Sequence, residues 1–171
     1  MDEYERAQRR LVEHDVLDRL GEIYAPLAGQ RVEAAALLVA RGLDALGADT
    51  AFVATVSADG KTLEVVRVTP ASENVVHLAF PLDSPYPIAE AIRGRRTMFI
   101  ASNEQLACDH PGLVRVQAAD HACATLPLFD PEGDLLGALN IGFEHPHEFD
   151  DEERRRIESL GELCACAMTP R

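Results

Sequence analysis

Apolar residues recur at helical spacing in three segments of the chain. In residues 2–27 they lie three or four residues apart and draw one stripe along an amphipathic helix: Val12, Val16, Leu20, Ile23 and Leu27. The Ala- and Leu-rich residues 32–46 are apolar on more than one side, which predicts a largely buried helix that ends at Gly47. Residues 151–168 predict a final helix, with an apolar stripe suited to the core or to a dimer seam: Ile157, Leu160, Gly161, Cys164 and Met168.

Between these helices the periodicity changes to that of strands. Six strands are predicted, over residues 50–57, 62–68, 75–82, 97–100, 121–128 and 135–143. Asp59-Gly60 forms the turn of the first hairpin. Short helices are predicted at residues 88–93 and within residues 102–116. Hairpin-joined strands with helices at the ends and in the middle indicate an α+β fold, an antiparallel sheet with helices on both faces.

The last strand and the last helix carry recognisable local signals. Small residues interrupt the strand at Gly137, Ala138 and Gly142, which predicts that helices approach it closely. Asp150 is placed to cap the final helix, and Glu153 follows three residues later, the spacing of a capping box.

The charge of the chain excludes several classes of partner. Asp and Glu number 29 against 16 Lys and Arg, a net charge of −13. Because such a chain repels phosphate backbones and anionic lipid surfaces, we expect neither nucleic acid nor a membrane as partner. Arginines at 154–156 follow four acidic residues, and pairing such as Asp151 with Arg155 predicts a solvated helix face. His145 and His147 lie in an acidic proline loop and are also expected to be solvated.

Location and redox state follow from two further features. The sequence shows no secretory signal and no apolar stretch long enough to cross a bilayer. Four cysteines at irregular spacing are typical of reduced thiols rather than a disulfide framework: Cys108, Cys123, Cys164 and Cys166. We therefore expect a cytoplasmic protein.

Several short motifs occur together in one order. They are Ala79–Pro85 with Ile88–Gly94, Thr97–Ile100, Ser102–Leu106, Gly133–Phe143 and Phe149–Glu153. In this order and spacing they resemble a bacterial GAF domain, a small-molecule sensing module. The resemblance covers about residues 34–167 and implies a PAS-related fold with a six-stranded antiparallel sheet and a pocket over one sheet face.

The resemblance also implies a division of the chain and a function. Residues 1–28 form an N-terminal amphipathic linker or dimerisation helix, and residues 29–171 form the GAF domain. We expect a non-catalytic sensory or regulatory domain of a bacterial signal-transduction protein. It would form a homodimer through its terminal helices and act on an effector, a kinase, a phosphatase or a transcription factor, in cis or in trans. The resemblance does not name the small-molecule ligand or a cofactor, because GAF domains of one fold bind different molecules or none.

The pocket has candidate contacts for two kinds of ligand, a cyclic nucleotide and haem. Where GAF domains bind cyclic nucleotides, helix N-termini and polar side chains hold the phosphate. Ser84, Tyr86 and Thr125, with amides at the start of the helix near Ile88, are the candidates for that role. Haem would require a histidine inside the pocket, and His77 on the third predicted strand is the candidate.

Two cysteines and two histidines form the last candidate group. Cys108 with His110, and His121 with Cys123, could bind a ligand, but their spacing matches no zinc motif and we expect no metal. Cys108-Asp-His110 resembles a bilin attachment sequence only weakly. Some GAF proteins are free methionine-(R)-sulfoxide reductases, so a small cysteine-based redox enzyme is one alternative function. A ligand-free dimerisation scaffold is the other.

Overall fold

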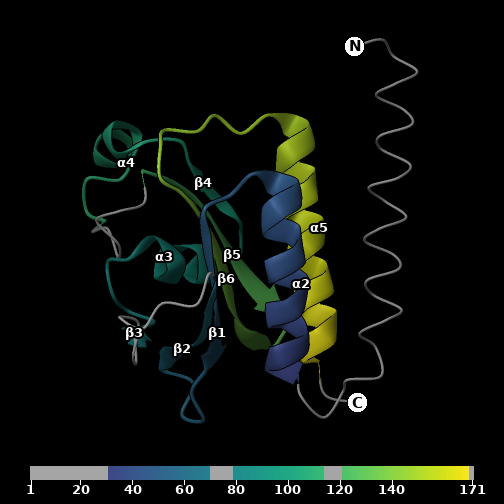
Figure 1. Ribbon diagram of the computed structural model, residues 1–171. Coiled ribbons are helices and arrows are strands. Elements are labelled where there is room, and N and C mark those ends of the chain that lie inside the picture. Colours follow the sequence, from purple (N-terminus) through teal and green to yellow (C-terminus); the bar gives the residue numbers. More distant parts are fainter. Residues whose placement is uncertain (1–30, 70–78, 114–120, 170–171) are drawn as a thin grey trace.

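The computed structural model describes residues 31–69, 79–113 and 121–169 (Figure 1). The described helices are α2 (Arg31–Leu46), α3 (Pro87–Arg93), α4 (Asn103–Asp109) and α5 (Asp151–Met168). The described strands are β1 (Thr50–Val56), β2 (Thr62–Thr69), β3 (Ala79–Pro81), β4 (Met98–Ile100), β5 (Ala122–Phe129) and β6 (Leu135–Phe143). The helix predicted over residues 2–27 and the first part of the third predicted strand lie outside the described residues.

The six strands form one sheet in the order β3-β2-β1-β6-β5-β4. Neighbouring strands are antiparallel throughout. Figure 1 shows α2 and α5 side by side over one face of the sheet, with α3 on the opposite face. The predicted α+β fold, a six-stranded antiparallel sheet with helices on both faces, is confirmed. Within the described residues, no helix combines the length and the apolar composition that crossing a bilayer requires.

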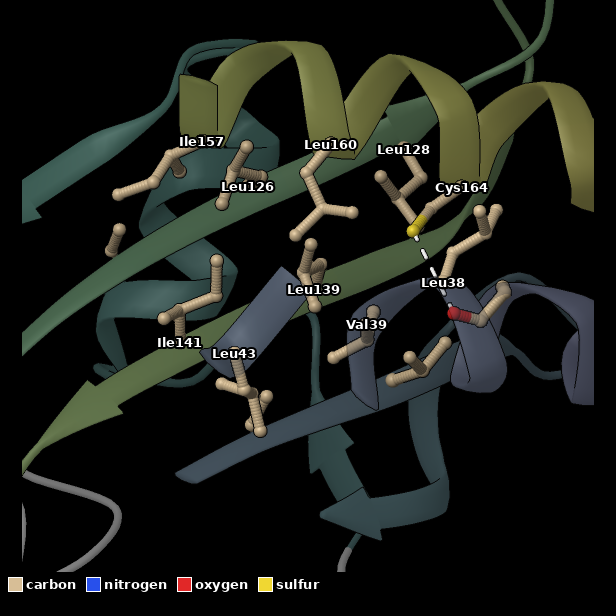
Figure 2. Close-up of a cluster of buried hydrophobic side chains, with 14 of the residues drawn as sticks. Leu38, Val39, Leu43, Leu126, Leu128, Leu139, Ile141, Ile157, Leu160 and Cys164 are labelled. Carbon is tan, nitrogen blue, oxygen red and sulfur yellow. Dashed lines mark hydrogen bonds between the residues drawn. The ribbon is translucent and has the colours of Figure 1, made fainter. Parts of the chain in front are cut away.

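Aliphatic side chains fill the space between the sheet and the α2/α5 layer (Figure 2). Alternate residues of each central strand point into this core, as strand geometry requires. From β5 and β6 these include Ala124, Leu126, Leu128, Leu139 and Ile141. The predicted apolar stripe of the last helix is buried here too: Ile157, Leu160, Gly161, Cys164 and Met168. Of the two predicted roles for that stripe, the interior of the domain is therefore the one it fills.

Cys164 shows how completely this core is shielded from solvent. Its side chain is fully buried, and its thiol donates to the backbone oxygen of Ala35 on α2 at 3.8 Å (Figure 2). Burial raises the pKa of the Cys164 thiol to about 12, because the thiolate would lose its hydration.

Gly161 and Gly137 each mark a close approach in the fold. A Cβ at Gly161 of α5 would lie 2.8 Å from Leu126 Cδ2 of β5, so the helix rests directly on that leucine. Gly137 of β6 has a different neighbour from the one predicted. A Cβ there would collide with the backbone oxygen of Ala54 on β1. The prediction that Gly137 serves helix packing is wrong, because the close neighbour is an adjacent strand.

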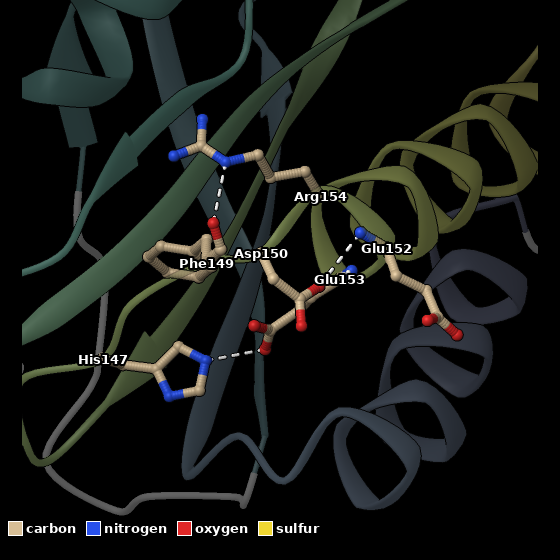
Figure 3. A network of polar contacts seen from close by, with 6 residues as sticks. All are labelled: His147, Phe149, Asp150, Glu152, Glu153 and Arg154. Carbon is tan, nitrogen blue, oxygen red and sulfur yellow. Dashed lines mark hydrogen bonds and ion pairs between the residues drawn. The ribbon is translucent and has the colours of Figure 1, made fainter. Parts of the chain in front are cut away.

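The cap of α5 is formed in one direction only (Figure 3). The carboxylate of Asp150 accepts hydrogen bonds from the amides of Glu152 and Glu153 at 2.9 and 2.8 Å. These bonds lower the pKa of Asp150, since they stabilise the charged carboxylate. The side chain of Glu153 does not return to the cap as a capping box requires, because its Oε1 lies 2.7 Å from Nε2 of His147.

His147 is held by several contacts, so the expectation that it is solvated is wrong. Its ring stacks on Phe143 with centroids 4.0 Å apart, and its backbone amide donates to the oxygen of Ala101 at 2.9 Å. Only 32% of its side chain is exposed. Through these contacts His147 joins the segment before α4 to the first turn of α5.

The arginines after the cap are exposed or half-buried, but their pairing differs from the predicted one. Arg155 donates from Nε to the backbone oxygen of Asp151 at 2.9 Å rather than to its carboxylate. An ion pair of this turn joins Arg156 to Glu152 at 2.6 Å, also four residues apart.

Candidate ligand-binding site

A buried polar pair lies on the sheet face opposite α2 and α5. Thr125 on β5 and Asn140 on β6 are cross-strand partners. Among the described residues, these two are the polar residues that are buried, with 1% of Thr125 and 8% of Asn140 exposed. The hydroxyl of Thr125 donates to Oδ1 of Asn140 at 2.7 Å. Burying polar groups costs free energy unless they are hydrogen-bonded, and the bond between Thr125 and Asn140 offsets part of that cost.

Apolar side chains surround the pair. Met98 of β4 is the cross-strand neighbour of Thr125, and Phe52 of β1 is the neighbour of Asn140. Both are buried. Cys123 precedes Thr125 by two residues on β5, so it lies on the same face, where it is half-buried. A small polar spot within an apolar surface is the composition typical of small-molecule sites.

α3 covers part of this face. Its Ile88 and Ile92 belong to a second apolar cluster, whose strand residues come from β1, β2, β3 and β6. Phe52 and Phe80 stack within it, with ring centroids 6.0 Å apart. Tyr86, the N-cap residue of α3, packs edge-on against Phe80 at 5.4 Å. The predicted site residue Tyr86 therefore anchors the start of α3 to the sheet.

The loop before α3 holds a second predicted site residue. Arg93 donates from its guanidinium to the backbone oxygens of Leu82 and Ser84 at 2.7 and 3.1 Å, which fixes the loop. The hydroxyl oxygen of Ser84 is buried and has no hydrogen-bond partner among the described residues. A buried hydroxyl left in that state is destabilising, so Ser84 remains a candidate ligand contact.

The predicted cysteines and histidines do not form one group. Cys108 on α4 is exposed, and His110 forms the C-cap of that helix. His121 is an exposed residue just before β5, whereas Cys123 lies on the same sheet face as the polar pair. Across the described ranges, no three His, Cys, Asp or Glu side chains are gathered as a metal site requires. His77 lies outside the described residues.

Two asparagines with notable side chains, Asn140 on this face and Asn103 at the start of α4, were not among the predicted site residues. Asn140 could have been found, because it is a carboxamide between Leu139 and Ile141 in an otherwise apolar strand. Asn103 gives no such signal, since polar residues are ordinary at a helix start. Its Oδ1 is buried without a partner in the described part of the chain, and its Nδ2 lies 3.4 Å from Nδ1 of His121.

The polar pair is adjacent in sequence to the contact with α5. Thr125 points to the sheet face opposite α2 and α5, and the next residue, Leu126, points to the other face and meets Gly161. A shift of β5 at Thr125 would therefore move a side chain that lies against α5 without free space between them.

The family of the chain is shown by its match to a family model. The model of the GAF domain matches residues 30–169, so the chain belongs to the GAF domain family. This confirms the resemblance seen in the sequence. No curated protein matches the sequence.

Solved structures agree with this assignment. Free methionine-R-sulfoxide reductase from Neisseria meningitidis, in complex with its substrate, has a TM-score of 0.74 at 16% identity, covering 94% of this chain and 90% of its own. The GAF domain of an Acinetobacter phosphoenolpyruvate-protein phosphotransferase has a TM-score of 0.71 at 12% identity, covering 92% of each chain. The GAF-B domain of DevS from Mycobacterium smegmatis has a TM-score of 0.60 at 22% identity, covering 78% of this chain and 88% of its own. At these identities the likeness shows the fold alone.

Proposed function

We propose that this GAF domain is a non-catalytic sensory or regulatory module that binds a small molecule on the sheet face of Thr125 and Asn140. The observation that carries the proposal is the burial of this hydrogen-bonded pair in an apolar face, on the side of the sheet opposite the α2/α5 core. Ser84 before α3 and Asn103 at the start of α4 are further candidate ligand contacts, because each has a buried oxygen without a partner among the described residues.

Transmission would run from β5 to the last helix. Occupancy at Thr125 biases the position of β5, and Leu126 carries that bias to Gly161 of α5. His147 provides a second connection, since it binds both Ala101 before α4 and Glu153 in α5. The output would be a small shift of α5 relative to α2, the scale of motion through which packed helices transmit signals.

The output partners are part of the same proposal. We infer a homodimer through the terminal helices, with the outer faces of α2 and α5 and residues 1–28 as the dimer surface. The apolar stripe of α5 is not available for that contact, because it is buried in the domain's own core. The effector would be a kinase, a phosphatase or a transcription factor. A cytoplasmic location suits the four cysteines, none of which forms a disulfide in the described structure.

A redox enzyme is the second candidate function, because Cys123 lies on the candidate ligand face and a similar fold belongs to a methionine sulfoxide reductase. In that reaction two thiols, such as those of Cys108 and Cys123, would be oxidised to a disulfide, and the sulfoxide would become a thioether with release of water. Turnover of free methionine sulfoxide with dithiothreitol, lost in Cys123→Ser or Cys108→Ser, would replace the sensory proposal.

A ligand screen with two readouts tests the sensory proposal. Nucleotides, haem and organic acids are first tested by thermal shift. A ligand of the folded state at about a hundred times its Kd adds about 2.7 kcal/mol, which raises the Tm by roughly 5 to 10 °C in a domain of this size. Hydrogen exchange then compares α5 with and without that ligand.

The two readouts separate three outcomes. Stabilisation with slower exchange in residues 151–168 supports sensing and transmission together. Stabilisation with unchanged exchange in α5 contradicts transmission through that helix. No stabilisation by any compound contradicts ligand sensing and favours the ligand-free scaffold.

A further inference from the structure

The polar pair offers a defined set of hydrogen-bonding groups. The proton of the Thr125 hydroxyl is committed to Oδ1 of Asn140. Threonine oxygen can still accept a bond, and a carboxamide has two N–H donors. Among the described residues, the side chain of Asn140 is hydrogen-bonded to Thr125 through its Oδ1. The pair therefore presents a donor beside an acceptor.

We propose that Thr125 and Asn140 select an uncharged ligand with an amide-like edge, a carbonyl oxygen next to an N–H. The ligand oxygen would accept from the Asn140 carboxamide, and its N–H would donate to the hydroxyl oxygen of Thr125. This inference rests on the proposed function and adds the chemical class of the ligand.

The charges near the pair disfavour an anionic ligand. A buried carboxylate or phosphate is stabilised best by a cationic partner. No Lys, Arg or His is buried among the described residues. Arg93, at the end of α3, is exposed and already binds Glu90 and the loop oxygens of Leu82 and Ser84. The net charge of −13 repels anions further.

A cationic ligand lacks a partner for the same reason. Within the described ranges no Asp or Glu is buried, so nothing acidic on this face would compensate a desolvated cation. The buried neighbours of the pair, Met98 and Phe52, are apolar and suit the body of a neutral molecule.

Three isosteric probes separate these classes. Benzamide carries the donor–acceptor edge, benzoate carries two acceptors and a negative charge, and benzamidinium carries only donors and a positive charge. Each is titrated into the ¹⁵N-labelled protein and followed by amide chemical shifts. Fragments of this size bind with a Kd of about 1 to 10 mM, which this method measures.

Two variants provide the controls. Thr125→Val with Asn140→Leu replaces both polar partners by apolar groups of similar shape, an exchange that is close to neutral for stability. Thr55→Val makes the same hydroxyl-to-methyl change on the opposite face of the sheet, where Thr55 pairs with Gly137. Dispersed amide spectra show that each variant is folded.

We expect benzamide to shift amides of β5 and β6 and to bind at least about tenfold more tightly than benzoate or benzamidinium. The double variant should lose this binding about tenfold or more, and Thr55→Val should retain it. Benzoate or benzamidinium binding as well as benzamide would overturn the amide class while leaving a ligand site. Benzamide binding that survives in the double variant, or no binding of benzamide at all, would overturn the role of the pair.

Discussion

The contact between β5 and α5 predicts a measurable coupling between two residues. Gly161→Ala would place a methyl group 2.8 Å from Leu126 Cδ2, well inside van der Waals distance. Overpacking of this kind costs about 1 to 3 kcal/mol. The change also gains about 1 kcal/mol of helix propensity, because glycine is poor in a helix interior. The expected loss of unfolding free energy is therefore about 0 to 2 kcal/mol.

Removing the leucine reverses the sign of the same change. Leu126→Ala alone should cost about 2 to 5 kcal/mol, because it opens a cavity in the buried core. In that background the methyl of Gly161→Ala meets no obstacle, so the change should stabilise by about 1 kcal/mol. The coupling energy between the two positions is then about 1 to 3 kcal/mol.

Urea unfolding of the wild type, the two single variants and the double variant, followed by circular dichroism at 222 nm, measures this coupling. Ala45→Gly, an exposed position of α2, is the matched control for helix propensity and should cost about 1 kcal/mol in both backgrounds. Additivity of Gly161→Ala and Leu126→Ala within about 0.5 kcal/mol would refute the close contact on which transmission is argued.

Three further predictions concern other parts of the domain. Asp150→Ala should lower the Tm more than Asp150→Asn. Because the folded pKa of Asp150 is lowered, its stabilisation is present at neutral pH and is lost as the pH falls through that pKa, which an acid titration of the wild type against both variants measures. Gly137→Ala should cost about 3 kcal/mol or more in urea unfolding, since the methyl would collide with the backbone of β1. With iodoacetamide at neutral pH, mass spectrometry should find Cys108 and Cys166 alkylated and Cys164 protected. Burial raises the pKa of Cys164 from 9.0 to about 12, so this thiol lowers the stability of the fold only as the pH rises above about 9.

Periodicity was sufficient to predict the sheet and the helices around it. Strand β6 over Leu135–Phe143 and helix α5 over Asp151–Met168 have the predicted bounds, because each has a strong apolar pattern with clear end signals. Periodicity shows that the stripe of α5 must be buried, but a dimer partner or the sheet of the same chain could bury it. Only the tertiary structure decides between them.

The local polar contacts were predicted less well, because they depend on neighbours distant in sequence. Glu153 has the spacing of a capping box, yet His147 is placed next to its carboxylate by the proline loop. His147 itself is drawn from solvent by the ring of Phe143, which belongs to the preceding strand. Such competition cannot be read from spacing alone.

The candidate site could be predicted in part. Thr125 was predicted as a polar residue of a strand, but its partner Asn140 was not, because the pairing of β5 with β6 had to be known residue by residue. The cysteines and histidines lie close in sequence, from Cys108 to Cys123, but they belong to different elements. Cys108 on α4 is exposed, whereas Cys123 on β5 is half-buried. His77 and residues 1–28 stay predictions.

Native mass spectrometry of the purified protein tests the central claim, that the face of Thr125 and Asn140 holds a small molecule. Wild type, Thr55→Val and the double variant Thr125→Val/Asn140→Leu are purified in parallel and sprayed from a volatile buffer. We expect the same added mass of an uncharged compound on the wild type and Thr55→Val, and its loss from the double variant. An unliganded wild type, or an added mass that the double variant retains, would contradict it.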